Sequence, residues 1–210
     1  MSDIVDIPLV KMNKIFPNKK GVDKSKLMIT NVGMYSVSKI KGSEKLIYLI
    51  KKYFNNSTNL TITDATSNVG SDSINLAMHF KQVNSIELDF NQFSVLKHNV
   101  EIYGLQNVNL INGNSLETIS TLKQDVVYID APWGGIDYKN AESMKLYLGD
   151  NELSQIYMEN KQYCKLMIFK VPKNYDFTYF IQHTDINKFC IHSYLGFDGS
   201  IKFYFIMCIE

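Results

Sequence analysis

One loop of the sequence combines an acid, a proline, the only tryptophan and two glycines. It runs from Asp130 through Pro132 and Trp133 to Gly135, directly after the apolar run 126–129. The indole offers a broad π-face on which a flat ring, above all a cationic one, can stack. Pro132 has no N–H, so neighbouring carbonyls are left to face a ligand amine. We predict that this loop holds a planar base, with a core tryptophan in a tight turn as the alternative.

Three further loops place polar residues at the ends of predicted strands. Asp64 ends one strand, and Gly70 precedes a helix whose free N–H groups suit the carboxylate of a methionine moiety. Glu87 ends the next strand, where an acid can accept both ribose hydroxyls of an adenosine. Asn114 follows the third strand and can bind an adenine edge. Together they predict a nucleoside cofactor; the alternatives are a plain turn, a solvated acid and a helix cap.

The elements that must position these loops alternate between strands and helices. Apolar runs predict strands at 60–63, 83–88, 108–111, 126–129 and 166–171, and helical spacing predicts helices at 43–54, 71–80, 91–103 and 115–122. Residues 190–195 and 201–209 flank a turn and predict a terminal hairpin. This alternation predicts a doubly wound, Rossmann-like α/β sheet, mostly parallel, with one antiparallel strand from the hairpin. Ligands of such sheets bind beyond the carboxyl ends of the strands, where the four loops lie.

Local signals predict the ends of these elements. Ser43 is expected to cap the helix at 43–54, and Gly104 to end the helix at 91–103. Residues 1–30 contain two prolines and a lysine-rich cluster, and are expected to form an irregular arm. The predicted organisation is an arm with a substrate and cofactor lip over residues 1–42, followed by one domain over residues 43–210.

Composition excludes several classes of protein. The 210 residues carry a net charge of +1 and no arginine, so a nucleic acid must be held locally, by stacking and a few lysines. No signal-peptide core or membrane span is present, and we expect an intracellular protein. The three cysteines are expected to be buried, reduced thiols, and the four histidines have no metal-ligand spacing. The bias toward Lys, Asn, Ile and Tyr is typical of an A- and T-rich genome, such as that of a parasite or a large DNA virus.

Taken together, these residues resemble the trimethylguanosine synthase family, the RNA cap guanine-N2 methyltransferases. The resemblance covers roughly residues 34–210 and is strongest in Pro132–Gly135 with Asp137–Tyr138, then in 33–38, 86–89, 99–104 and 171–174. It implies a class I methyltransferase domain with S-adenosyl-L-methionine as cofactor and an N7-methylguanosine-capped RNA or nucleotide as partner, without a metal. The cofactor-binding residues would be Ser38, Asp64, Gly70, Glu87, Asn114 and Asp130. The substrate-binding residues would be Trp133, Gly134, Lys173 and Asn174, and the catalytic ones Asp130, Pro132 and Trp133.

The sequence departs from the family pattern in both predicted sites. Asn68, Ser71 and Asp72 replace Gly, Gly and Asn in the glycine-rich loop, which favours a non-catalytic relative that binds a cap or a protein. Glu87 replaces the aspartate that binds the ribose in the family pattern. Asp130-Ala131 replaces Ser-Pro, and an Asp there is the mark of adenine-N6 methyltransferases. Three functions therefore remain: guanine-N2 transfer, adenine-N6 transfer and binding alone. For the first, orientation of the amine toward the sulfonium methyl supplies most of the acceleration.

Overall fold

The structure is a computed structural model that describes residues 3–209, apart from the side chains of residues 136 and 137. The predicted motif residue Asp137 therefore lies outside the described side chains. Contacts divide the chain into two compact units, Met1–Ser115 and Leu116–Glu210, called the first and the second unit below. The first carries the predicted cofactor loops up to Asn114, and the second carries the tryptophan loop.

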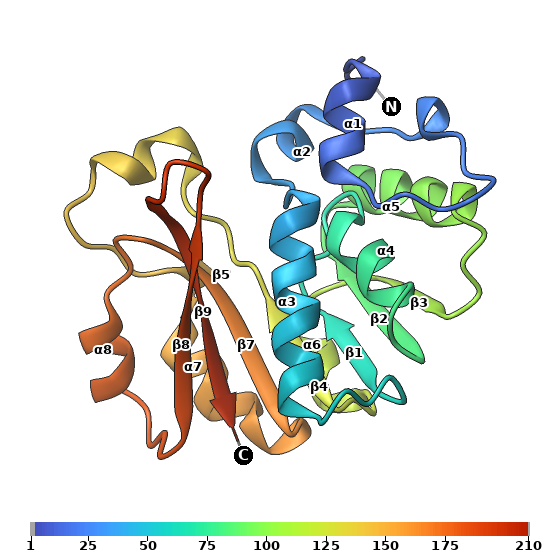
Figure 1. Ribbon diagram of the computed structural model, residues 1–210. Coiled ribbons are helices and arrows are strands. Elements are labelled where there is room, and N and C mark those ends of the chain that lie inside the picture. Colours follow the sequence, from blue (N-terminus) through green and yellow to red (C-terminus); the bar gives the residue numbers. More distant parts are fainter. Residues whose placement is uncertain (1–2, 210) are drawn as a thin grey trace. The chain divides into compact units, whose positions relative to one another are not determined.

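The first unit is built on three parallel strands with helices beside them (Figure 1). The strands are β1 (Thr61–Asp64), β2 (Gln82–Glu87) and β3 (Val108–Asn112), in the order β3-β2-β1. The helices between and before them are α3 (Ile40–Tyr53), α4 (Ser71–Ala77) and α5 (Phe90–Ile102). Asp89 caps α5 by accepting from the Gln92 N–H at 2.9 Å, and Gly104 at φ +58° ends it as predicted.

The N-terminal arm is ordered and packs into the core of the first unit. It contains α1 (Leu9–Ile15) and the 3₁₀ turn η1 (Lys24–Lys26), and α2 (Asn31–Ser36) follows it. The expectation of an irregular arm over residues 1–30 was therefore wrong at α1 and η1. Phe16 and Ile29 are fully buried in the same cluster as Tyr103. The Asn99 amide donates to the Met28 and Val69 carbonyls, each at 2.9 Å. These contacts tie the arm to the first predicted loop; the boundary at residue 42 stays a prediction.

Ser43 does not cap a helix. Helix α3 begins three residues earlier, with Lys39 at the N-cap position, and Ser43 is buried within its first turn. The Ser43 hydroxyl instead donates to the Asp72 carboxylate on α4. A buried hydroxyl must find a partner, and here that partner lies on a neighbouring helix rather than on its own backbone. Tertiary contact has overridden the local signal.

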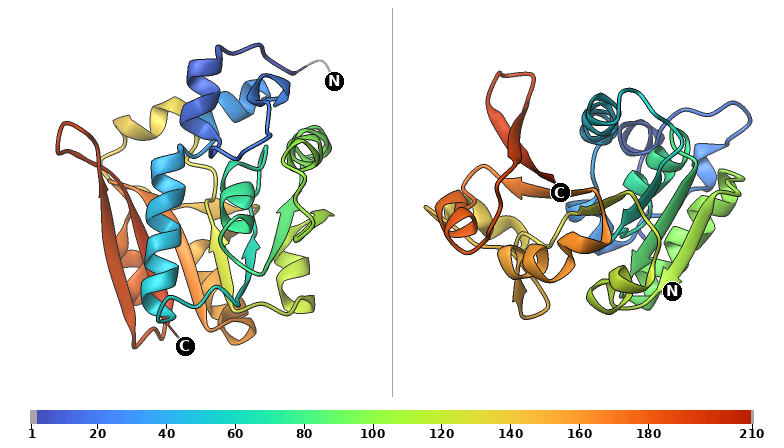
Figure 2. Two further views of the ribbon diagram at one scale, coloured as in Figure 1. Left: turned by 45° about the vertical axis from the view of Figure 1, so that its right-hand side comes forward. Right: turned by 90° about the horizontal axis from the view of Figure 1, so that it is seen from below.

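The second unit holds four strands in the order β4-β7-β9-β8. They are β4 (Val126–Ile129), β7 (Leu166–Pro172), β8 (Phe189–Leu195) and β9 (Ile201–Ile209). Strand β7 is parallel to β4 and antiparallel to β9, and β8 and β9 form the predicted hairpin, drawn as a long red ribbon in Figure 2. Shorter elements complete the unit: α6 (Ser115–Thr118, which begins on the last residue of the first unit), η2 (Ile119–Thr121), η3 (Gly135–Asn140), β5 (Tyr147–Leu148), β6 (Asn151–Glu152), α7 (Leu153–Asn160), η4 (Lys161–Tyr163) and α8 (Phe177–Gln182).

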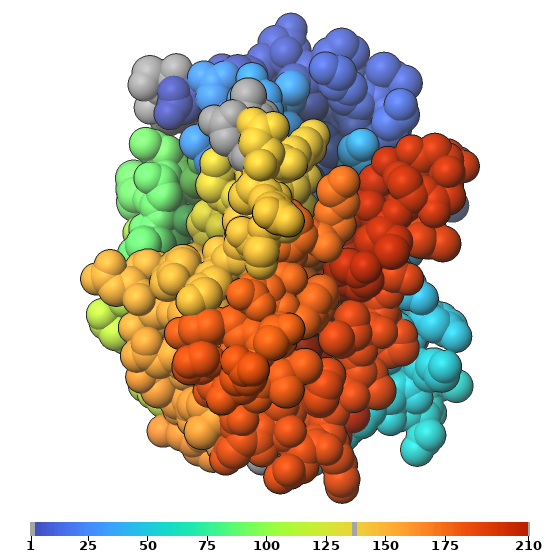
Figure 3. All heavy atoms as spheres, turned by 90° about the vertical axis from the view of Figure 1, so that its left-hand side faces the viewer, coloured from blue at the N-terminus to red at the C-terminus, as the bar shows by residue number. Residues whose placement is uncertain are grey.

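The predicted α/β class, mostly parallel with one antiparallel strand from the C-terminal hairpin, is confirmed. Every residue of β4 and β7 is buried, as expected for strands covered on both faces. Figure 3 shows a face of the second unit, where the yellow to red residues form the surface. The three cysteines are free, but Cys190 is exposed on β8, so the expectation that all three are buried was wrong. No helix of the described residues has the length and apolarity to cross a membrane.

Candidate functional site

The first predicted loop, residues 64–70 and called the cofactor loop below, turns through two left-handed residues. Asn68 has φ +48° and Gly70 has φ +95°. Asparagine tolerates this region better than other side chains. Its amide also holds the turn, because Oδ1 accepts from the Val69 N–H at 2.7 Å and Nδ2 donates to Ser36 Oγ at 2.7 Å. The replacement of a family glycine by Asn68 is therefore accommodated locally.

Glu87 ends β2 and supports the cofactor loop directly. Its Oε2 accepts from the Asn68 N–H at 2.7 Å, and its Oε1 accepts from the Asp89 N–H at 2.8 Å. Burial raises the pKa of the Glu87 carboxyl above its usual range, although these backbone hydrogen bonds oppose the shift. Each carboxylate oxygen has a second lone pair, so the group keeps capacity for two ribose hydroxyls. These acceptor oxygens fit the adenosine end of the implied cofactor.

Asp64 lies beneath the cofactor loop rather than on its surface. The side chain is 1% exposed, and Oδ2 accepts from Ser73 Oγ at 2.6 Å. The Ser73 hydroxyl is also hydrogen-bonded to Ser85 Oγ at 2.7 Å, and the Ser85 hydroxyl donates to Ser67 Oγ at 2.8 Å. A buried network whose members satisfy one another fixes its geometry. Asp64 is thus placed to hold the loop in shape, and its contact with a cofactor stays a prediction.

The two other cofactor residues predicted in the first unit lie at its loop ends. Ser38 is 6% exposed, between α2 and α3, and Asn114 is half-buried directly before α6. Each has an interaction within the structure. Their roles stay predictions.

In the second unit, the predicted base-holding loop follows β4. Trp133 contacts the Tyr138 ring edge-on, with centroids 5.2 Å apart, and lies 6.5 Å from the Phe203 ring. Its indole Nε1 is buried and has no hydrogen-bond partner among residues 3–209. Gly134 has φ +80° and Gly135 φ +77°, so both need the freedom of glycine, and a Cβ on either would meet open space. Exposed Pro132 borders this half-buried ring.

A lysine that the sequence interpretation missed lies beside this loop. Lys170 Nζ is 2.6 Å from Asp130 Oδ2, and their side chains are only 9% and 14% exposed. The same ammonium lies 5.5 Å from the Trp133 ring centroid and 5.1 Å from that of Phe203. The available signal was a single charge inside the apolar strand 166–171. Asp130 was predicted as a cofactor-binding and catalytic residue, and the structure pairs its carboxylate with a cation of this chain.

The segment after β7 carries the last predicted substrate residues. Asn174 Nδ2 donates to the Tyr138 and Ala141 carbonyls at 2.8 and 2.7 Å, so it holds both ends of the turn that follows Trp133. Its Oδ1 is buried without a hydrogen-bond partner in the described part of the chain. Lys173 is exposed. The structure therefore brings together Asp130, Trp133 and Asn174 around one aromatic cluster. Lys173 lies directly after β7.

Two other features of the chain lack the predicted site residues or the ligands of a site. A hollow of about 510 Å³ in the N-terminal arm is lined by lysines and asparagines but contains none of the predicted site residues: Leu9, Asn13, Asn18, Lys19, Lys20, Val22, Asp23 and Lys24. Lys19 and Lys24 already donate to the Tyr103 and Phe16 carbonyls. Over residues 3–209, no group of three or more His, Cys, Asp or Glu side chains is placed to hold a metal ion. The cofactor loop of the first unit and the tryptophan loop of the second unit remain the candidate sites.

Comparison with known proteins decides the family. A family model described as RNA cap guanine-N2 methyltransferase matches residues 59–208. The chain belongs to the RNA cap guanine-N2 methyltransferase family. The match includes every predicted site residue of both units except Ser38, which precedes it. The resemblance inferred from the tryptophan loop is confirmed.

The chain spans only 55% and 65% of the length of two curated relatives that it matches. It is 37% identical over 140 residues to an uncharacterized protein of Acanthamoeba polyphaga mimivirus, covering 63% of this chain and 55% of that protein. It is 29% identical over 157 residues to the trimethylguanosine synthase of Schizosaccharomyces pombe, covering 70% and 65%. The structure of precorrin-6y C5,15-methyltransferase from Geobacter metallireducens GS-15 superposes with a TM-score of 0.61 at 13% identity, covering 90% of this chain and 98% of that one. This last likeness extends the methyltransferase fold over most of the chain.

Proposed function

We propose that this chain transfers a methyl group from S-adenosyl-L-methionine to the exocyclic N2 amine of an N7-methylated guanosine, as found in an RNA cap. Membership in the cap guanine-N2 methyltransferase family supports the reaction class. The observation that carries the substrate is the single tryptophan in a Gly-Gly loop after β4. A ring bordered by residues that need glycine's freedom, with open space where side chains would be, is suited to stacking with a flat base.

The residues of the chain divide the work. When bound, S-adenosyl-L-methionine supplies a methyl group activated by a positive sulfur. Glu87 would accept the ribose hydroxyls, and the cofactor loop around Gly70, with Ser38, Asp64 and Asn114, would hold the rest of that molecule. Trp133 would stack on the base, and Lys173 would offer a point charge to a phosphate. The Asp130 carboxylate and the Ala131 carbonyl would accept hydrogen bonds from the amine, which aims the nitrogen lone pair at the methyl. The proton that the nitrogen loses after transfer would pass to solvent.

Orientation is the main source of rate in this proposal. The exocyclic amine is a poor nucleophile because its lone pair is delocalised into the ring. Holding the reacting atoms about 3–3.5 Å apart and in line can supply much of the acceleration without a strong base. Tyr138 and Asn174 fix Trp133 and the turn that follows it, which favours such fixed placement.

Adenine-N6 transfer is the second candidate, and Asp130 is the observation that favours it. A carboxylate after β4 suits an amine on either base. The third candidate, binding alone, rested on the altered glycine loop. The Asn68 side chain supports that loop through two hydrogen bonds, so the alteration favours an intact site.

Radiolabelled S-adenosyl-L-methionine and matched nucleotides test the proposal. We expect transfer to m7GTP and capped RNA, less to GTP, and none to ATP. Trp133→Ala should abolish methyl transfer. It should keep the rise in melting temperature caused by S-adenosylhomocysteine, because a ligand that binds only the folded state stabilises that state. Trp133→Phe should keep part of the activity. Transfer to ATP would replace the substrate proposal, and cofactor binding without transfer to any base would favour the non-catalytic relative.

A further inference from the structure

We propose that Lys170 is a specificity-determining residue that sets how strongly this site prefers a cationic, N7-methylated guanine over a neutral one. The inference rests on the proposed function, because it concerns the base that Trp133 would hold. Lys170 is not among the residues that the family resemblance assigned.

The position of Lys170 is unusual for a lysine. It is 7% exposed, in a strand whose every residue is buried. Lysine is rarely buried so deeply unless its charge is paired, and here the pair is with Asp130 at 2.6 Å. No side chain of Leu166–Phe169 or of Val171 carries a charge. An otherwise apolar strand therefore carries an ammonium beside the tryptophan loop.

The ammonium also lies beside the aromatic rings themselves. Lys170 Nζ is 5.5 Å from the Trp133 centroid and 5.1 Å from the Phe203 centroid, both within the range of cation–π attraction. A methylated guanine stacked on Trp133 would bring a second positive charge to the same ring. Two like charges beside the same ring repel each other, and the repulsion is strong where water is largely excluded.

Asp130 and Lys170 therefore act on the base in opposite directions. Alone, the Asp130 carboxylate would favour a cationic ring; paired, its charge is matched by that of Lys170. Trp133 still attracts the cation through its π-face. The pair thus moderates a preference that the tryptophan alone would give, so each partner can be removed to move the preference in a known direction.

Trp133 provides the measurement, since it is the only tryptophan and its fluorescence reports directly on base stacking. The wild-type chain is titrated with m7GTP and with GTP, and the ratio of the two dissociation constants is the readout. We expect Lys170→Met to raise the preference for m7GTP roughly tenfold, equivalent to ~1.4 kcal/mol. Asp130→Asn should lower the preference. The double variant, which removes both charges, should return close to the wild-type ratio.

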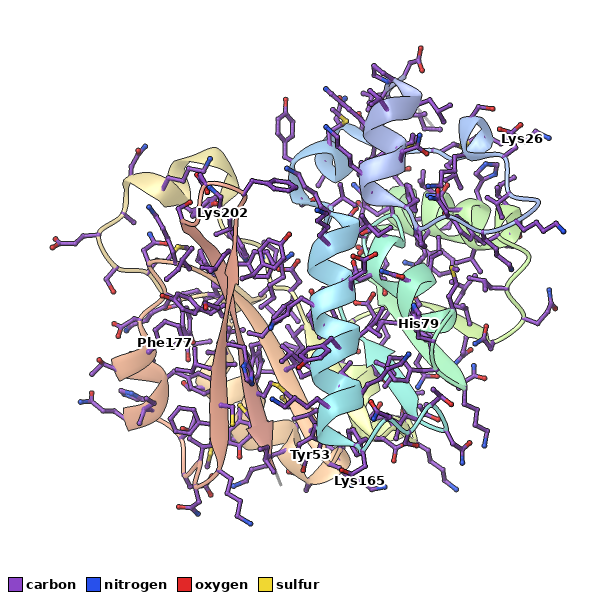
Figure 4. All side chains as sticks on the ribbon, viewed as in Figure 1. Lys26, Tyr53, His79, Lys165, Phe177 and Lys202 are labelled. Atoms are coloured by element: carbon purple, nitrogen blue, oxygen red, sulfur yellow. The ribbon has the colours of Figure 1, made fainter. Side chains whose placement is uncertain are left out.

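Lys165→Met is the matched control. Lys165, labelled in Figure 4, directly precedes β7. It pairs with Asp125 at 2.8 Å, but its side chain is 69% exposed. Its loss should leave the ratio unchanged. Removing one partner of a buried pair is destabilising, so melting temperatures are measured in parallel. If Lys170→Met does not fold, Asp130→Asn and the double variant decide.

The outcomes separate the two proposals. An unchanged or lower preference in Lys170→Met overturns the role of Lys170, and so does a double variant that behaves like Asp130→Asn. In either case both nucleotides still bind and the proposed function stands. If neither guanine nucleotide binds the wild-type protein, the proposed function fails, and the inference that rests on it fails with it.

Discussion

The backbone N–H of Asn68 donates to Oε2 of Glu87 over 2.7 Å, which joins the cofactor loop to the end of β2. Both residues replace family residues, Asn68 a glycine and Glu87 an aspartate. The glutamate is one methylene longer, and it accepts from both Asn68 and Asp89. The Glu87 side chain, at the end of the second strand, therefore fixes the turn at residue 68 through its backbone N–H.

Removal of the Glu87 carboxylate should cost cofactor binding through two effects. Glu87→Ala loses the acceptor for the ribose hydroxyls and also releases the Asn68 N–H. We expect an affinity for S-adenosylhomocysteine lower by at least about tenfold, or ~1.4 kcal/mol, and a smaller rise in melting temperature. Glu87→Gln keeps one acceptor and should lose less. Glu101→Ala, an exposed glutamate on α5, is the control, and equal affinities for it and Glu87→Ala would contradict the assignment.

Cofactor binding should strengthen as pH rises through the titration of Glu87. Burial raises the pKa of this carboxyl in the free protein above its usual range of about 4.3. Ribose hydroxyls donate to the ionised form, so bound cofactor lowers the pKa and binding releases a proton. Affinity should therefore increase with pH up to the raised value and stay flat above it. In the free protein the sign is opposite: the folded state holds this proton more tightly, so stability falls as pH rises through the same window.

Calorimetry with S-adenosylhomocysteine from pH 4.5 to 8 measures this dependence. The Glu87→Gln variant cannot titrate at this position and should show a flat affinity over the window. A wild-type profile that runs parallel to that of Glu87→Gln would sink the prediction.

The left-handed backbone at Asn68 predicts an unusual ranking of substitutions. Both Asn68→Gly and Asn68→Ala lose the bond to Ser36, but glycine keeps the turn, whereas alanine places a plain side chain at φ +48°. The left-handed penalty for a residue other than glycine is about 1–2 kcal/mol. For a domain of this size, ~1 kcal/mol lowers the melting temperature by roughly 2–4 °C. The alanine variant should therefore melt below the glycine variant; the reverse order would contradict the role of the turn.

Elements fixed by local pattern were predictable from sequence. The all-apolar run 126–129 and the hairpin strand 201–209 coincide with β4 and β9. The arm was not predictable in the same way, because its helix α1 is only seven residues long and is stabilised by packing of residues such as Phe16 against the distant Tyr103. Ser43 failed for a related reason, since its partner Asp72 lies 29 residues away.

The candidate site divides along the same line. A lone tryptophan beside two glycines can be recognised from the sequence as a candidate site, because few structural roles need that combination. The pairing joins Asp130, directly after β4, to Lys170 on β7, 40 residues away, and it depends on strand register, which the sequence alone does not fix. Charge at a site is therefore the property that sequence interpretation represents least well.

Asn174 should act on base binding by holding the turn after Trp133. Its Nδ2 donates to the Tyr138 and Ala141 carbonyls, and Tyr138 in turn contacts the indole. Asn174→Asp replaces both donors by a carboxylate that faces these carbonyl oxygens, so it removes two hydrogen bonds and adds repulsion. Asn174→Ala only removes the bonds, and a typical hydrogen bond contributes about 0.5–1.5 kcal/mol.

We therefore expect m7GTP binding, followed by Trp133 fluorescence, to weaken in the order wild type, Asn174→Ala, Asn174→Asp. The affinity for S-adenosylhomocysteine should change little, because its proposed contacts to Glu87 and Gly70 belong to the first unit. Asn187→Ala, an exposed asparagine of the second unit, controls for a general loss of stability. Equal weakening of both ligands in the Asn174 variants would mean that the residue supports the fold rather than the turn. If Asn174→Asp binds m7GTP as tightly as Asn174→Ala does, the added carboxylate does not face the two carbonyls when the base is held.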